Sequence, residues 1–147
     1  MSNSKPSALF WIIAIVLGFI WNAYGVYLFV FDTYLATPEL YGEMGYSAEQ
    51  IEFMDTFPGW YTIVYGIATI TGLLGAICML LRKRLAVPLF GISLLGVLVN
   101  MCYGFFFTNS AEINGNFLAY GMPLIVIIIG IILYYYSKGA VLKGWLT

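Results

Sequence analysis

Hydrophobic residues occur in four long blocks, instead of alternating or recurring at helical spacing along the chain. The blocks cover about residues 8–31, 60–81, 85–107 and 117–136. A helix of roughly 20 to 24 residues is about 30 to 36 Å long, which matches a bilayer core of about 30 Å. The pattern therefore predicts an all-α integral membrane protein, with a bundle of four transmembrane helices in a single membrane domain over residues 1–147.

Composition agrees with lipid as the solvent of these blocks. Hydrophobic residues make up 62% of the chain and charged residues only 9%, against about 25% charged in an ordinary soluble domain. The first block is longer than the core of a signal peptide, so we expect it to be a permanent span.

The charged residues separate completely between the two ends of the predicted bundle. The basic residues precede the first block, join the second to the third or follow the fourth: Lys5, Arg82, Lys83, Arg84, Lys138 and Lys143. The acidic residues occupy the other two connections: Asp32, Glu39, Glu43, Glu49, Glu52, Asp55 and Glu112. Because Lys and Arg are retained in the cytoplasm, both termini are expected there and the acidic connections outside.

The outer loop over residues 32–59 carries signals for two short helices. Thr37 precedes Pro38, a typical first helical position, and Ser47 with Gln50 forms a capping-box pattern. Ile51 and Met54 share one face of the second helix, so it can lie flat at the outer surface. An alternative is that the carboxylates of this loop guard a solute entrance.

Two amides stand out inside the spans, because an unpaired polar group in hydrocarbon is costly. Asn22 follows Gly18 by four residues, and Asn100 follows Gly96 by four. Small residues at this spacing let helix backbones approach closely. The predicted helix-packing positions are Gly18, Gly72, Gly96 and Gly104.

These amides have two interpretations. In one, Asn22 and Asn100 form hydrogen bonds between helices and hold the bundle together. In the other, they line a pocket open to the outside together with Tyr65, Tyr103 and Tyr120. Amides and phenols supply donors and acceptors without charge, which suits a neutral polar solute or a lipid headgroup.

The first and last pairs of spans show matched positions that are typical of a duplicated hairpin. The matches are Gly18 with Gly96, Asn22 with Asn100, Tyr65-Gly66 with Tyr120-Gly121, Gly75 with Gly130 and Lys83 with Lys138. Apolar chains also match by chance, and the offsets differ between the pairs. The sequence therefore leaves open whether the two hairpins are related.

Several function classes can be set aside. A net charge of −1 provides no basic field for nucleic acid. There is no His, and the two Cys are isolated in apolar runs, so neither zinc-ligand spacing nor a catalytic dyad can be assembled. No carboxylate lies within the predicted spans, so we expect no enzyme activity, cofactor or metal, and facilitated rather than proton-driven movement of any solute.

Six segments resemble one family of proteins. They are residues 81–94, 103–106 and 136–140 with 144–146, the stretch Ser4-Lys5-Pro6, and Phe10-Trp11. Together they are similar to short four-helix bacterial inner-membrane proteins that are often named sugar transporters. The resemblance implies an inner-membrane location and transport of a sugar, and it implies no set of binding residues. That family often has Gln near the position of Asn100.

Taken together, these observations lead us to expect a small membrane protein that binds or transports a small neutral polar solute such as a sugar. The alternative is a non-catalytic accessory subunit or lipid-binding scaffold of a larger membrane complex. The expected partners are membrane lipids and either a second copy of the chain or another membrane protein. A four-span carrier is expected to need a dimer to surround its solute.

Overall fold

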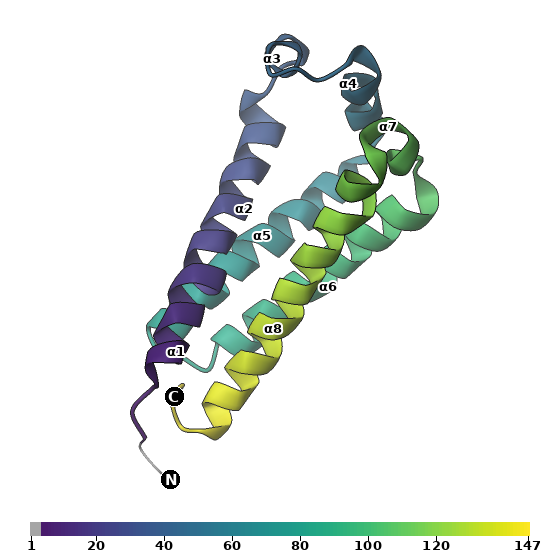
Figure 1. Ribbon diagram of the computed structural model, residues 1–147. Coiled ribbons are helices and arrows are strands. Elements are labelled where there is room, and N and C mark those ends of the chain that lie inside the picture. The colour runs from purple at the N-terminus through teal and green to yellow at the C-terminus, as the bar shows by residue number, and fades with distance from the viewer. Residues whose placement is uncertain (1–3) are drawn as a thin grey trace.

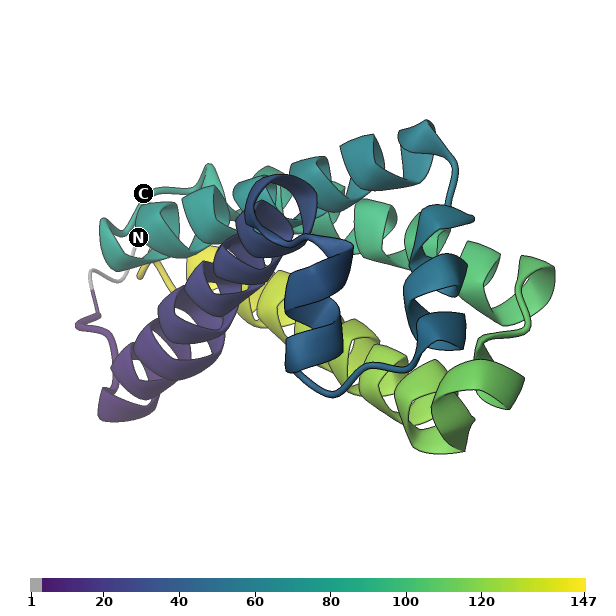
Figure 2. The ribbon, with the colours of Figure 1, turned by 90° about the horizontal axis from the view of Figure 1, so that it is seen from above.

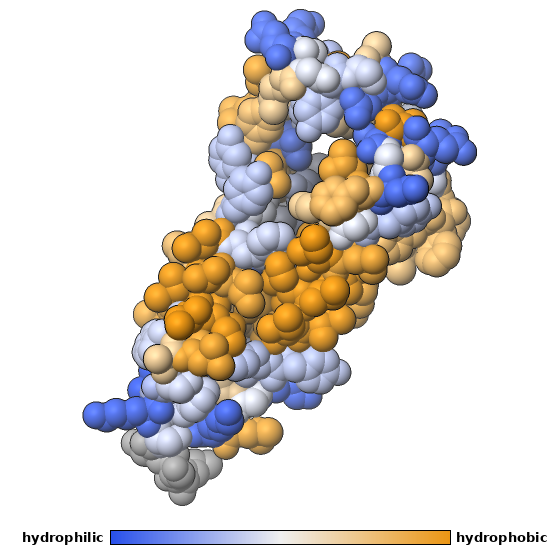
Figure 3. All heavy atoms as spheres, in the orientation of Figure 1, coloured by the Kyte–Doolittle hydropathy of each residue, from blue (hydrophilic) through white to orange (hydrophobic). Residues whose placement is uncertain are grey.

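The computed structural model describes residues 4–147, and that part of the chain is helical without a strand. Its helical segments Ala8–Leu35, Gly59–Leu80, Ala86–Phe107 and Ser110–Leu142 are long and apolar enough to cross a membrane. On the face shown in Figure 3, hydrophobic residues gather across the middle of the molecule, between two more hydrophilic ends. These features are those of a multi-pass membrane protein, as the sequence predicts.

The first long helix runs further than its hydrophobic block. It consists of α1 (Ala8–Ile12), η1 (Ile13–Ile20), α2 (Trp21–Val30) and η2 (Phe31–Leu35), where η marks wider π-helical turns. The Ser7 hydroxyl caps its start by accepting from the amide of Phe10. The helix therefore continues four residues past the predicted span end at residue 31. Asp32 lies in the last turns of the helix and not in a loop.

The two short helices of the loop over residues 36–58 form where their capping signals predict. These are α3 (Pro38–Glu43) and α4 (Ala48–Asp55). The Thr37 hydroxyl accepts from the amide of Leu40 at 3.3 Å, and Ser47 and Gln50 form the predicted capping box. The Gln50 amide also donates to Asn114 at 3.2 Å. This bond joins α4 to a further short helix, α7 (Ser110–Asn116), which the sequence pattern does not predict.

We call α3, α4 and α7 together the cap. Within α4 the buried side chain is Phe53, at 8% exposure, whereas Ile51 and Met54 on the predicted face are half-buried. The Phe53 ring packs edge-on against Phe57, with ring centroids 5.2 Å apart. Phe53 therefore anchors the cap, and α4 is not simply an amphipathic helix lying on a surface.

The other long helices are α5 (Gly59–Leu80), α6 (Ala86–Phe107) and α8 (Met122–Leu142). The first two match the predicted spans closely, while α8 continues well past the predicted end at residue 136. The π-helical segment η3 (Phe117–Gly121) precedes it. The π-helical turns lie close to Pro123, and a proline predicts an irregular helix there because it has no N–H to donate.

Helix α5 packs against α6 on one side and against the first long helix on the other, and α8 packs on α6. Small residues allow both approaches. A Cβ added to Gly96 of α6 would lie 2.9 Å from the Cβ of Ala68 in α5. A Cβ added to Gly18 would lie 3.5 Å from the Cβ of Ala76 in α5. Gly104 differs, because no atom of another residue outside its own helix backbone lies within 4 Å of such a Cβ.

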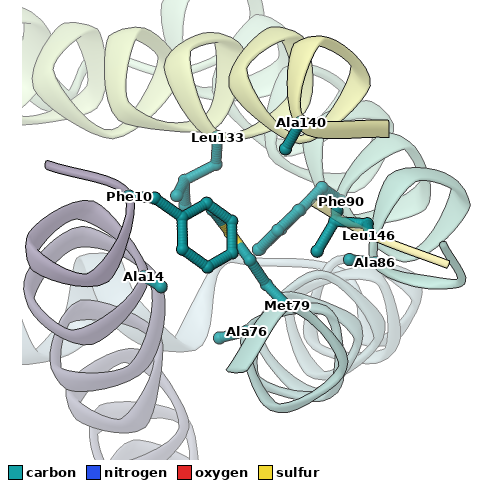
Figure 4. Close-up of a cluster of buried hydrophobic side chains, with 9 residues drawn as sticks. All are labelled: Phe10, Ala14, Ala76, Met79, Ala86, Phe90, Leu133, Ala140 and Leu146. Carbon is teal, nitrogen blue, oxygen red and sulfur yellow. The ribbon is translucent and has the colours of Figure 1, made fainter. Parts of the chain in front are cut away.

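The core lies at the end of the molecule that holds both termini (Figure 1). Its buried side chains come from all four long helices and the C-terminal tail: Phe10, Ala14, Ala76, Met79, Ala86, Phe90, Leu133, Ala140 and Leu146. Figure 4 shows the Phe10 ring reaching between Leu133 and Met79. This end of the structure is therefore tightly closed.

Polar contacts tie the C-terminal tail to the turn between α5 and α6. Arg82 adopts a left-handed conformation with φ 57°, and its Nε donates to the carbonyl of Trp145 at 2.8 Å. The amide of Thr147 donates to the carbonyl of Arg82 at 2.8 Å. The tail thus closes over the core. At the other end, α2 and α8 diverge beneath the cap (Figures 1 and 2).

The close approach of α6 and α5 can be tested with two glycines of one helix. Gly96→Ala should destabilise the protein because its methyl group would press on Ala68, and overpacking of this kind costs about 1–3 kcal/mol. Gly104→Ala adds the same methyl group in open space and should have no such effect. Thermal unfolding in detergent measures both. Equal stabilities of the two variants would contradict the packing described.

Candidate functional site

A cavity of about 460 Å³ lies between the long helices and extends from their middle toward the cap. We call it the central cavity. Its lining comes from the first long helix (Trp21, Asn22, Tyr24, Gly25, Leu28, Asp32), from α5 (Tyr61, Tyr65, Ala68, Thr69), from α6 (Ser93, Val97, Asn100, Met101) and from α8 (Met122, Val126, Ile129, Gly130, Leu133). The surface is hollowed below the cap in Figure 3.

Asn100 is the most unusual polar residue of the lining. It is only 4% exposed, and its Nδ2 donates to the main-chain carbonyl of Tyr61 in α5 at 3.2 Å. Because a carbonyl can only accept, this contact fixes which way the amide points. The Oδ1 atom is buried and has no hydrogen-bond partner. A buried polar atom left in this way costs about 1–3 kcal/mol.

Asn22 satisfies its donor within its own helix. Its Nδ2 lies 2.7 Å from the carbonyl oxygen of Gly18 and 3.4 Å from that of Leu17. Its Oδ1 occupies the place where a Cβ of Gly72 would lie, so Gly72 makes room for it. The hydrogen bonds of Asn22 therefore do not join two helices, unlike the bond from Asn100.

Ser93 and Thr69 belong to the same lining, although the sequence analysis does not single them out. Ser93 Oγ donates to the carbonyl of Ala68 at 2.6 Å, and Thr69 Oγ1 donates to that of Tyr65 at 3.0 Å. Helical spacing could have found them. Ser93 lies seven residues before Asn100, and Thr69 four residues after Tyr65, which places each on the face of a predicted site residue.

The predicted site residues separate into two groups. Asn22, Tyr65 and Asn100 meet at the central cavity, whereas Tyr103 and Tyr120 do not line it. The Tyr103 ring packs edge-on against Trp60, with centroids 5.2 Å apart. The Tyr120 ring is 44% exposed and lies beside Phe105. Aromatic packing at the helix ends therefore directs these two rings elsewhere.

A second cavity of about 450 Å³ lies beneath the cap, and we call it the vestibule. It shares Asp32, Tyr61 and Tyr65 with the central cavity. Asp32 Oδ1 accepts from the hydroxyl of Tyr41 at 2.9 Å. Burial, together with this bond and the charge of Asp32, raises the pKa of the Tyr41 phenol well above its usual range. Tyr41 therefore remains a hydrogen-bond donor to Asp32 at neutral pH. The carboxylate of Asp32 lies where the two cavities meet.

The electrostatic character of the site is one-sided. Asp32 and Asp55 line the vestibule, and no Lys or Arg lines either cavity. Within residues 4–147 no group of three or more His, Cys, Asp or Glu side chains could hold a metal ion.

Comparisons of the chain with protein-family models, curated proteins and solved structures find no match. The geometry of the cavities is thus the basis for any functional conclusion.

Asn100→Leu separates a binding role of this residue from a structural one. Leucine has a similar shape and removes both the bond to Tyr61 and the unpaired Oδ1 atom. We expect thermal stability equal to or above that of the wild type, because the two losses offset each other. An amide that mainly holds the helices together would instead lower the stability by about 1 kcal/mol.

Asn22→Leu serves as the comparison variant in the same thermal unfolding experiment. Its side chain faces Gly72, and its two carbonyl contacts would be lost. It should therefore destabilise the protein clearly. A stability loss for Asn100→Leu as large as that for Asn22→Leu would contradict the distinction.

Proposed function

We propose that this protein binds a small polar solute in the central cavity and transports it across the membrane. The observation that carries the proposal is that Asn100, whose buried Oδ1 has no hydrogen-bond partner, is a lining residue of that cavity. Membrane-buried polar groups are rare, and those without a partner in the protein are candidates to bind a ligand.

The shape of the molecule supports transport by alternating access. The cavity lies at the cap end, while the core around Phe10 and Met79 closes the opposite end. This arrangement corresponds to a state open toward the cap. We propose that the cap faces outward and both termini lie in the cytoplasm, because all basic residues lie at the termini end. The resemblance to sugar transporters favours the inner membrane of a bacterium and a sugar as the solute.

A lipid-binding scaffold is the second candidate, and the apolar part of the lining favours it. Leu28, Val97, Val126 and Ile129 border the cavity, and α2 and α8 make little direct contact beside it. A lipid tail could enter between these helices while its headgroup reached Asn100. This role would suit an accessory subunit of a larger membrane complex.

Native mass spectrometry of the protein released from mild detergent distinguishes these candidates. The wild type should retain one small solute, and Asn100→Leu should release it while remaining folded. A retained lipid mass would favour the scaffold, and a second copy in the same spectrum would show the expected dimer. A wild-type protein that carries neither solute nor lipid would contradict both candidates.

A further inference from the structure

The polar groups of the central cavity have largely used their hydrogen-bond donors within the protein. Asn22, Thr69, Ser93 and Asn100 each already donate to a main-chain carbonyl. The hydrogen-bonding capacity that these four side chains have left is therefore mainly oxygen lone pairs, although the Oδ1 of Asn22 is packed against Gly72. Asn100 keeps a second N–H, so the bias toward accepting is strong but not complete.

The aromatic residues add a second feature of the lining. Trp21, Tyr24, Tyr61 and Tyr65 border the cavity, and the face of an aromatic ring attracts cations. Their hydroxyl and indole groups are the other donors of the lining. The lining thus combines the acceptor oxygens of four polar side chains with four aromatic residues, whose hydroxyl and indole groups supply the donors.

Asp32 adds a negative charge at the mouth of the cavity. It lies ten residues after Asn22 in the same helix, which corresponds to about 15 Å along the axis. Its carboxylate is held by Tyr41 and borders both cavities. None of the six Lys and Arg residues lines the cavity, so no basic side chain there neutralises the charge of Asp32.

We propose that the solute carries a protonated amine, which Asp32 attracts at the mouth and the oxygen acceptors around Asn100 hold inside. This inference rests on the proposed function and replaces the expected neutral solute by a cationic one. An ammonium group has three donors and no acceptor, so it satisfies Asn100 Oδ1 without needing donors from the lining. A sugar hydroxyl both donates and accepts, so its oxygen would depend on the hydroxyl and indole donors of the aromatic residues.

Desolvation explains why all three features are needed. Burying a charge is costly unless it is paired and hydrogen-bonded. The carboxylate, the acceptor oxygens and the aromatic faces together offset that cost for a cation, and none of them would do so for an anion. A focused negative field at the vestibule also raises the local concentration of cations.

Matched probes test the proposal in lipid nanodiscs made of zwitterionic lipid. Benzylamine is an ammonium ion at neutral pH, benzyl alcohol is its neutral counterpart of similar shape, and glucose represents a neutral polar solute. Calorimetric titration should show benzylamine binding at least about tenfold more tightly than either neutral probe. Asn100→Leu should abolish this binding.

A pair of charge variants tests the role of the carboxylate. Asp32→Asn should weaken benzylamine binding by about tenfold. Glu112→Gln removes a charge from an exposed residue of α7 that borders neither cavity, and it should leave binding unchanged. Equal effects of the two variants would overturn the role of Asp32.

The outcomes separate this inference from the proposed function. Tighter binding of benzyl alcohol or glucose than of benzylamine, lost in Asn100→Leu, would overturn the cationic solute and support the cavity as a solute site. Failure of all three probes to bind the folded wild type would overturn both. Benzylamine binding that persists in Asn100→Leu would overturn the assignment of the site to the central cavity.

Discussion

The structure depends on the small residues of α5, which allow two other helices to approach its backbone. In lipid there is no hydrophobic force between helices, so close van der Waals contact takes its place. Ala68 meets Gly96 of α6, and Ala76 meets Gly18 of the first long helix. Between them, Gly72 leaves the space that Asn22 occupies. A larger side chain on this stripe would separate the helices that form the cavity.

This packing closes one end of the molecule and leaves the other hollow. At the termini end, large side chains such as Phe10 and Met79 fill the space between the helices, and the C-terminal tail covers them. At the cap end, α2 and α8 diverge and the cap crosses above the space between them (Figure 2). The hollow half is where the amides, hydroxyls and Asp32 are found. The same arrangement of helices thus creates a place for a ligand and supplies its polar groups.

Local patterns predicted the elements whose causes are local. The extent of each hydrophobic block gives the spans, and the capping residues Thr37 and Ser47 give α3 and α4. The hydrophobic block predicts a first span that ends near Phe31, before the charge of Asp32. The helix itself continues to Leu35, because the next residues that stop it are Thr37 and Pro38. The helix α7 was missed because its start has no side-chain cap and Gly115 interrupts it with φ 82°. The sequence pattern is therefore least informative where a helix lacks a strong capping residue at its start or end.

The sequence pattern predicts three of the residues that line the central cavity, and it does so through helix packing. Asn22, Asn100 and Tyr65 point to one cavity because they follow the stripes of small residues that bring the helices together. Tyr103 follows Asn100 by only three residues, yet Tyr103 and Tyr120 pack against aromatic neighbours and do not line the cavity. The unpaired state of Asn100 Oδ1 depends on the position of Tyr61 on another helix, which spacing along one helix cannot reveal. The polar side chains of the lining have used donors because they bond to carbonyls of their own helix or of a neighbouring helix.

Cysteine labelling tests most directly whether the central cavity is open to water from the cap side. Thr69 lines the cavity, and its neighbour Ile70 is 45% exposed on the outer surface of α5. In a background where Cys78 and Cys102 are replaced by Ala, Thr69→Cys should react with a membrane-impermeant thiol reagent added to the outer side of intact cells. Ile70→Cys, which faces lipid, should not react. Protection of Thr69→Cys from the outside, or labelling only from the cytoplasmic side, would contradict an outward-open solute cavity.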